Sequence, residues 1–117
     1  MPTVIEWRPG EEPRVVDWPE LTAEAINRFV GGDLFCTAFV IGMPGLGQAL
    51  VGYCDDEGLL KGLPITCYRW DGAPIAGPVV VMGRSGSTER GLAAGGSTAF
   101  FSLIGHELRP AQEALRG

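Results

Sequence analysis

Short apolar runs separated by glycine and proline make up most of this chain. Residues 3–7 and 14–18 are two such runs on either side of a Pro-Gly-Glu-Glu turn, which predicts an antiparallel hairpin. Residues 48–54, 65–70 and 77–82 are also short, mostly apolar and bounded by turn residues, so each is predicted to be a strand. The pattern therefore indicates many short strands joined by tight turns.

One segment has the period of a helix instead. Apolar side chains recur at helical spacing within residues 19–30, and Gly31 follows as a residue that can adopt the left-handed conformation which ends such a helix. At the other end, Asp17 with Glu20 resembles a capping box, and Thr22 is a competing N-cap. The apolar stripe comprises Ala25, Ile26, Phe29 and Val30.

Four further segments complete the chain. Residues 34–41 are apolar on both alternating faces, which is typical of a central strand covered on both sides. Residues 83–97 are rich in Gly and Ser and poor in apolar residues, which predicts a long flexible loop. Residues 98–104 are apolar and are expected to form a strand or a short helix. A short C-terminal helix is predicted over 110–115, because Pro110 suits the first helical position.

These elements predict a single α+β domain over residues 1–117. Its mixed or mostly antiparallel sheet should have five to six strands, with the main helix at about 19–30 packed on one face. One helix cannot cover both faces of the strand at 34–41. The C-terminal segment, the other half of a curled sheet or a second subunit must cover the second face, which motivates a homodimer hypothesis.

Length and charge narrow the function classes. The chain has 117 residues, which suits one domain, and 14 acidic against 9 basic residues give a net charge of −5. A negative surface offers nothing to a phosphate backbone, so direct nucleic-acid binding is not expected. We expect no signal peptide and no membrane span, and predict a cytoplasmic protein. The three cysteines, Cys36, Cys54 and Cys67, form no metal-binding motif and are predicted to be reduced, buried thiols.

Two glycine-containing segments are candidate ligand loops. Gly42, Gly45 and Gly47 have the spacing GxxGxG and precede a predicted strand, so a hairpin turn is favoured over a nucleotide-binding loop. The segment from Gly83 to Arg90 is similar to loops that cradle an oxyanion with backbone N–H groups and an arginine. It lacks their nucleophilic cysteine, which excludes covalent chemistry. Anion binding remains an alternative to a solvated loop, through Arg84, Ser85, Gly86, Ser87 and Arg90.

No other cluster indicates catalysis. Asp55, Asp56 and Glu57 are adjacent, so their carboxylates diverge, and a solvated turn is favoured over a cation site. His106 is the single histidine, and nothing in the sequence places a cysteine beside it. We therefore expect no enzyme, no catalytic residue, no metal and no cofactor.

Three tryptophans are many for this length. If the first hairpin forms, Trp7 and Trp18 could lie near each other on its face, with Trp70 elsewhere. Large aromatic side chains are usually buried, so packing in the core is the favoured interpretation. The alternative is an exposed aromatic patch for a protein partner.

Several short motifs occur together along the chain. They are Pro9-Gly10, Val30-Gly31-Gly32, Asp56-Glu57-Gly58, Gly62-Leu63-Pro64 and the run from Ile75 to Val81. In this order they resemble the domain-of-unknown-function family 3846. The resemblance spans about residues 3–104 and implies a small protein of the kind often found in phages, plasmids and bacterial genomes. The family has no established activity, so the resemblance implies no catalytic residue.

The favoured hypothesis is a non-enzymatic binding or regulatory module of mobile-element type that contacts an unidentified protein partner. The alternative is a domain that binds a small molecule or anion between the Gly42 to Gly47 loop and the Gly83 to Arg90 loop. A third hypothesis is an acidic decoy of a DNA-binding protein.

Overall fold

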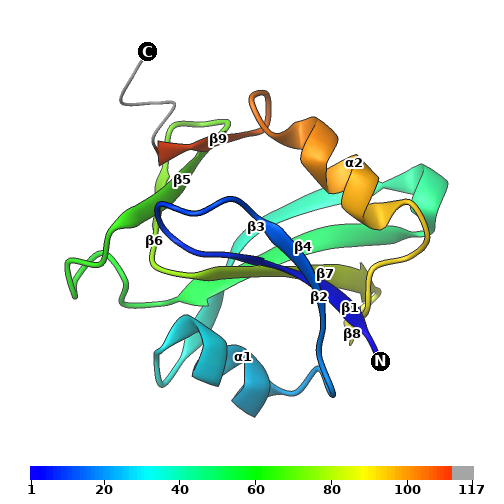
Figure 1. The fold of residues 1–117 in the computed structure, drawn as a ribbon, viewed down its shortest axis with the longest axis horizontal. Coiled ribbons are helices and arrows are strands. Elements are labelled where there is room, and N and C mark those ends of the chain that lie inside the picture. The colour runs from blue at the N-terminus through cyan, green and yellow to red at the C-terminus, as the bar shows by residue number, and fades with distance from the viewer. Residues whose placement is uncertain (112–117) are drawn as a thin grey trace.

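A six-stranded antiparallel sheet forms the centre of the fold (Figure 1). The structure, a computed structural model, describes residues 1–111. The strand order is β2-β1-β7-β4-β3, and β8 pairs with β7 outside this path. The predicted first hairpin and the predicted α+β class are confirmed. The strands are β1 (Thr3–Trp7), β2 (Arg14–Asp17), β3 (Phe35–Met43), β4 (Gln48–Asp55), β7 (Val79–Ser85) and β8 (Thr88–Arg90).

Each face of this sheet is covered by a different layer. Helix α1 (Ala23–Val30) lies on one face, while α2 (Gly96–Leu103) and a small sheet lie on the other (Figure 1). The small sheet has the order β6-β5-β9 and is antiparallel. Its strands are β5 (Ile65–Arg69), β6 (Pro74–Ala76) and β9 (Leu108–Pro110).

Two apolar clusters fill the space between these layers. Val80 of β7 packs toward α1, and its neighbour Val81 packs toward α2, and both are fully buried. Since adjacent residues of a strand point to opposite faces, a strand buried at consecutive positions is covered on both sides. β7 is therefore the central strand, paired with β1 and β4.

The prediction that residues 34–41 form a central strand is wrong. β3 lies at the edge of the sheet and pairs only with β4. A shift in register between Thr37 and Phe39 marks a β-bulge, and such an extra residue reverses which face the later side chains reach. Phe35 accordingly packs on the α1 side, and Phe39 packs on the α2 side. The bulge explains why this run is apolar at both alternating positions.

Helix α1 is shorter than predicted. It begins at Ala23, and Thr22 is its N-cap, with the Thr22 hydroxyl accepting a hydrogen bond of 3.1 Å from the Ala25 N–H. The capping box of Asp17 and Glu20 is wrong, since Asp17 belongs to β2. The predicted end is confirmed, because Gly31 caps the helix with a left-handed φ of 80°.

Much of the predicted long loop over 83–97 is regular structure, and residues 91–95 join β8 to α2 outside any helix or strand. β7 continues to Ser85, a two-residue turn follows, and β8 returns along β7. Gly86 is the first turn residue and has a φ of 63°, the sign that a type II′ hairpin requires there. For residues 98–104 the helical alternative is confirmed by α2. Pro110 is the last residue of β9, and the helix predicted over 110–115 lies almost wholly outside the described residues, which end at Ala111.

The second face of the main sheet is covered by the chain itself. Phe100 of α2 and Leu108 of β9 are fully buried in the cluster on that face. A second subunit is therefore not needed to cover this face, and the homodimer stays a prediction.

Replacing Gly52 by valine should destabilise the β3–β4 pair. Phe39 lies opposite Gly52, and a Cβ at Gly52 would come within 2.4 Å of its ring. Because Phe39 is buried, the ring has little room to move, and we expect a loss of about 1–3 kcal/mol in the free energy of unfolding. Urea unfolding measures this, with Gly42→Val as control, since nothing lies within 4 Å of a Cβ at Gly42. Equal losses would contradict the packing described here.

Candidate functional site

The two candidate ligand loops lie side by side at one end of the main sheet. The turn between β3 and β4 and the hairpin of β7 and β8 enclose an open cleft of about 540 Å³, named here the hairpin cleft. Val40, Gly42 and Ala49 line its sheet side, and Arg84 lies across from them. Further lining residues are Met43, Pro44, Gly47, Gln48, Ser85 and Gly86.

Strand register brings these loops together. β3 and β4 stay paired as far as Met43 and Gln48, and the 3-10 helix η1 (Pro44–Leu46) closes their turn. β4 then pairs with β7 so that Ala49 lies opposite Arg84. Arg84 is thus placed one residue beyond the start of β4, beside the β3–β4 turn.

Arg84 is a cationic side chain with an unused donor. Its Nε is buried and has no hydrogen-bond partner within residues 1–111, and none of the ion pairs of that region includes Arg84. Glu89 lies directly opposite on β8, yet its carboxylate accepts a hydrogen bond of 2.9 Å from the Tyr53 hydroxyl. A buried donor without a partner is costly, so the Arg84 Nε–H keeps the capacity to donate a hydrogen bond to a further acceptor.

Tyr53 keeps Glu89 engaged. Burial, followed by the hydrogen bond to Glu89 and the charge of Glu89, raises the pKa of Tyr53 to about 12. The phenol is therefore protonated at neutral pH and donates to Glu89. The Glu89 carboxylate, directly opposite Arg84, is thereby held by Tyr53.

The hairpin of β7 and β8 does not bring its two arginines together. Arg84 lies opposite Glu89, while Arg90 lies opposite Gly83, one position along the ladder. Adjacent positions of a strand face opposite sides of a sheet, so Arg84 and Arg90 point to different faces. Ser85 and Gly86 line the hairpin cleft with Arg84, and Ser87 lies exposed in the turn.

Gln48 lines the cleft but is already used by the fold. Its Oε1 accepts a hydrogen bond of 2.9 Å from the Ala93 N–H, and its Nε2 donates to the Gly91 carbonyl at 3.4 Å. The amide therefore fastens the segment after β8 to β4. Sequence reasoning missed both Gln48 and the Tyr53 and Glu89 pair, because only the β4–β7–β8 register shows that they are neighbours.

The three tryptophans do not form a common patch. Trp7 is buried on the α2 side, where its ring meets Phe100 edge-on at 5.8 Å. Trp18 is buried on the α1 side, and its Nε1 donates a hydrogen bond of 2.8 Å to Glu6. The prediction that these two lie near each other is wrong, because the hairpin places them on opposite faces. Trp70 is 51% exposed in the turn between β5 and β6.

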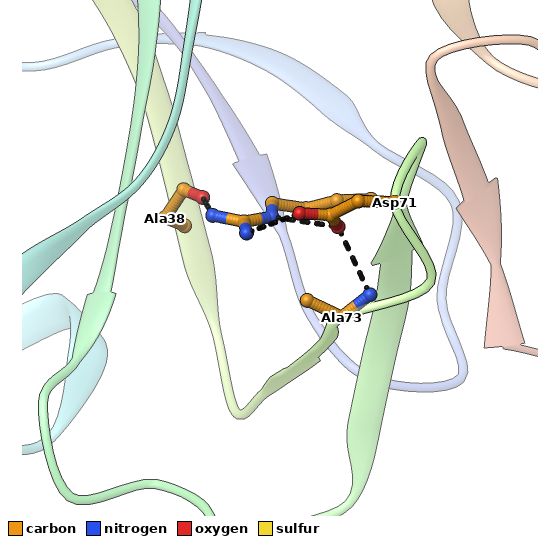
Figure 2. A network of polar contacts seen from close by, with 4 residues as sticks. Ala38, Asp71 and Ala73 are labelled. Carbon is orange, nitrogen blue, oxygen red and sulfur yellow. Dashed lines mark hydrogen bonds and ion pairs between the residues drawn. The ribbon is translucent and has the colours of Figure 1, made fainter.

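A polar network holds the edge strand at its bulge. Arg69 donates from Nη1 to the Ala38 carbonyl at 3.2 Å, and its Nη2 lies 2.6 Å from the Asp71 carboxylate (Figure 2). Asp71 also accepts a hydrogen bond of 3.0 Å from the Ala73 N–H (Figure 2). The pKa of Asp71 is lowered, chiefly by the hydrogen bond from Arg69. The network ties β3 of the main sheet to the β5–β6 turn.

A second cavity, of about 210 Å³, lies beside this network and is lined by Cys36 and Cys54 as well as Arg69. The two sulfurs are 3.7 Å apart. Burial raises the pKa of Cys54 and of Cys67 to about 12, and it also raises the pKa of Cys36. All three side chains belong to the apolar cluster on the α2 side.

The acidic turn differs from the prediction at one residue. Asp56 and Glu57 are exposed, but the Asp55 side chain is buried and lies 2.6 Å from the Lys61 ammonium. His106 is exposed after α2. Within residues 1–111 no three His, Cys, Asp or Glu side chains gather as metal ligands. No helix in that region is long and apolar enough to cross a membrane.

Comparison with known proteins identifies the family. The model of the family described as Domain of unknown function (DUF3846) matches residues 2–94, and the chain belongs to this family. No curated protein and no solved structure matches the chain. The family match ends before α2 and β9, which contribute to the core on the second face.

Proposed function

We propose that this chain is a non-enzymatic binding domain whose hairpin cleft holds a small organic anion. The observation that carries the proposal is the Arg84 guanidinium, which lies at the cleft with a buried Nε that no group in the described chain satisfies. A charge-assisted hydrogen bond from the Arg84 Nε–H to an anionic oxygen of a ligand would remove that cost.

The chemistry of the cleft favours a carboxylate joined to a small apolar group. A planar guanidinium matches a carboxylate with two parallel hydrogen bonds. Val40 and Pro44 supply apolar surface around this charge. One arginine in a chain of net charge −5 suits a single negative charge better than a polyphosphate.

The lining side chains support binding in place of catalysis. Ser85 supplies the one side-chain hydroxyl among the residues that line the cleft, and His, Cys, Asp and Glu are not among them. A serine nucleophile needs an adjacent general base for activation.

Titration calorimetry with benzoate and hexanoate tests the proposal. We expect saturable binding of the carboxylates and none of the matching neutral amides. Arg84→Ala should weaken binding about tenfold or more, which is the usual range for a charge-assisted pair. Arg90→Ala is the matched control, because this arginine of the same hairpin faces the other way. Equal binding of amides, or equal losses in both variants, would refute the anion site.

Glu89→Gln should strengthen carboxylate binding about two- to fivefold. The change removes a negative charge beside Arg84 while keeping a group that can accept from Tyr53. Tyr53→Phe should have the opposite effect, because it releases Glu89 to pair with Arg84 and so to compete with the ligand. Calorimetry of both variants checks the two signs, and a change in the same direction for both would contradict the arrangement.

A protein partner remains a second candidate function. Trp70 is half exposed, and the Arg69 guanidinium lies 5.7 Å from its ring centroid, a pairing common at interfaces. Trp70→Ala should then abolish capture of a partner by the immobilised protein, while Phe101→Ala, another exposed aromatic, should leave capture unchanged. The origin in mobile elements and the acidic-decoy role stay predictions.

A further inference from the structure

Cys36 and Cys54 face each other across the β3–β4 ladder. They are direct register partners, and their Sγ atoms are 3.7 Å apart. Residues directly opposite in an antiparallel pair have Cα atoms about 4.5–5.5 Å apart, which lies within the range of about 4.4–6.8 Å that disulfides span. A small change in side-chain rotation is enough to bring the sulfurs to bonding distance.

The two thiols differ in access. Cys36 is half-buried on the edge strand, whereas Cys54 is buried in the neighbouring strand β4. Both line the second cavity, which is large enough to admit a small oxidant. Cys67 is fully buried in β5, where its register partners are Ile75 and Pro110, so it has no cysteine opposite it.

We propose that Cys36 and Cys54 are a redox modification site that a peroxide converts reversibly into a disulfide. The Cys36 thiolate attacks one peroxide oxygen, the O–O bond breaks, and the other oxygen leaves as hydroxide and takes up a proton to form water. Cys54 then attacks the Cys36 sulfenic acid, the S–O bond breaks, and the second oxygen leaves as water with the Cys54 proton. The peroxide gains the two electrons that the two sulfurs lose.

The disulfide would add a covalent attachment between the edge strand β3 and its neighbour β4. In the reduced protein, β3 is anchored beside its bulge by the Arg69 bond to Ala38. A covalent bond at Cys36 closes the hairpin that carries η1 and one wall of the hairpin cleft. Oxidation is therefore expected to raise the denaturant concentration needed to unfold the protein.

Mass spectrometry after prolonged incubation with hydrogen peroxide tests the site in the intact chain. Long incubation is needed because burial raises the pKa of Cys36 and leaves little thiolate. We expect a loss of about 2 Da, reversed by dithiothreitol. Trypsin would leave both cysteines in one peptide between Arg28 and Lys61, so chymotrypsin, which cuts between them at Phe39, maps the bond.

Cysteine variants distinguish a Cys36–Cys54 disulfide from other oxidation products. Cys67→Ala should show the same mass loss, whereas Cys36→Ser and Cys54→Ser should lose it. A bond mapped to Cys67, linkage between two chains, stable oxygen adducts on Cys36, or three free thiols after incubation would each overturn the proposal. The mapping on the unmodified sequence decides the matter even where a variant fails to fold.

Discussion

Replacing Phe100 by alanine is expected to lower the free energy of unfolding by about 3–5 kcal/mol. The Phe100 side chain is fully buried between α2 and the main sheet, and it meets the Trp7 ring edge-on at 5.8 Å. Removing it leaves a cavity under a helix of only eight residues, which has few other buried anchors. The loss combines the transfer free energy of the ring with the cost of that cavity.

Chemical denaturation of the two neighbouring phenylalanine variants measures this effect. Phe101 is the matched control, since it follows in the same helix but is 41% exposed. Phe101→Ala should cost about 1 kcal/mol, in proportion to its smaller buried area. Similar losses for both would mean that α2 does not pack as described. The result matters beyond α2, because this helix lies outside the family match at residues 2–94 yet completes the core.

Asp55→Ala is expected to have the second largest effect, a loss of about 2–3 kcal/mol. The buried carboxylate accepts hydrogen bonds from the Lys61 ammonium at 2.6 Å and from the Glu57 N–H at 3.0 Å. It also packs against Gly32, where a Cβ would lie 2.5 Å from Oδ1. The residue thus fastens the turn after β4 to the end of α1. Urea unfolding checks the loss, with exposed Asp56→Ala as control.

The same carboxylate makes stability depend on pH. The Lys61 hydrogen bond, with that of the Glu57 N–H, lowers the pKa of Asp55 below its ordinary value of 3.8. The folded state therefore binds fewer protons than the unfolded state near that pH, so the contribution is fully present at neutral pH and is lost as the pH falls below about 3.8 toward the folded pKa. The urea concentration at the unfolding midpoint should drop between pH 7 and pH 3, and this drop should be smaller in Asp55→Asn than in the unsubstituted chain. An equal fall would contradict the ion pair.

Local signals explain which elements could be predicted. Turn residues defined the first hairpin, and Gly31 defined the end of α1. The bulge after Thr37 could not be predicted, because two apolar faces in one strand have the same pattern whether the strand is central or bulged at an edge. The hairpin at Gly86 was missed because its second strand, β8, has only three residues, all of them polar. Tertiary pairing with β7, and not hydrophobic periodicity, stabilises it.

The candidate site was predictable in its parts but not in its assembly. Glycine spacing and Arg84 marked two loops that the β4–β7 register makes neighbours. The pairing of β7 with β8 places Arg90 on the other face of the sheet. Sequence spacing alone could not predict this, because the segment was expected to be a loop without strand pairing. Burial of Trp7 and Trp18 on opposite faces likewise follows from sheet topology. The sequence therefore indicated which single residues could bind a ligand, and the strand pairing determined which of them lie together.

The most direct test of the proposed anion site is an NMR titration of the ¹⁵N-labelled protein with benzoate, followed through its backbone amide and arginine Nε–H resonances. We expect saturable shifts confined to the hairpin cleft, at Gly42, Gly47, Ala49 and residues 84–86, with the Arg84 Nε–H resonance moving most. Shifts that gather instead around Trp70 or the Cys36 cavity, or that rise linearly without saturation across the whole chain, would contradict it.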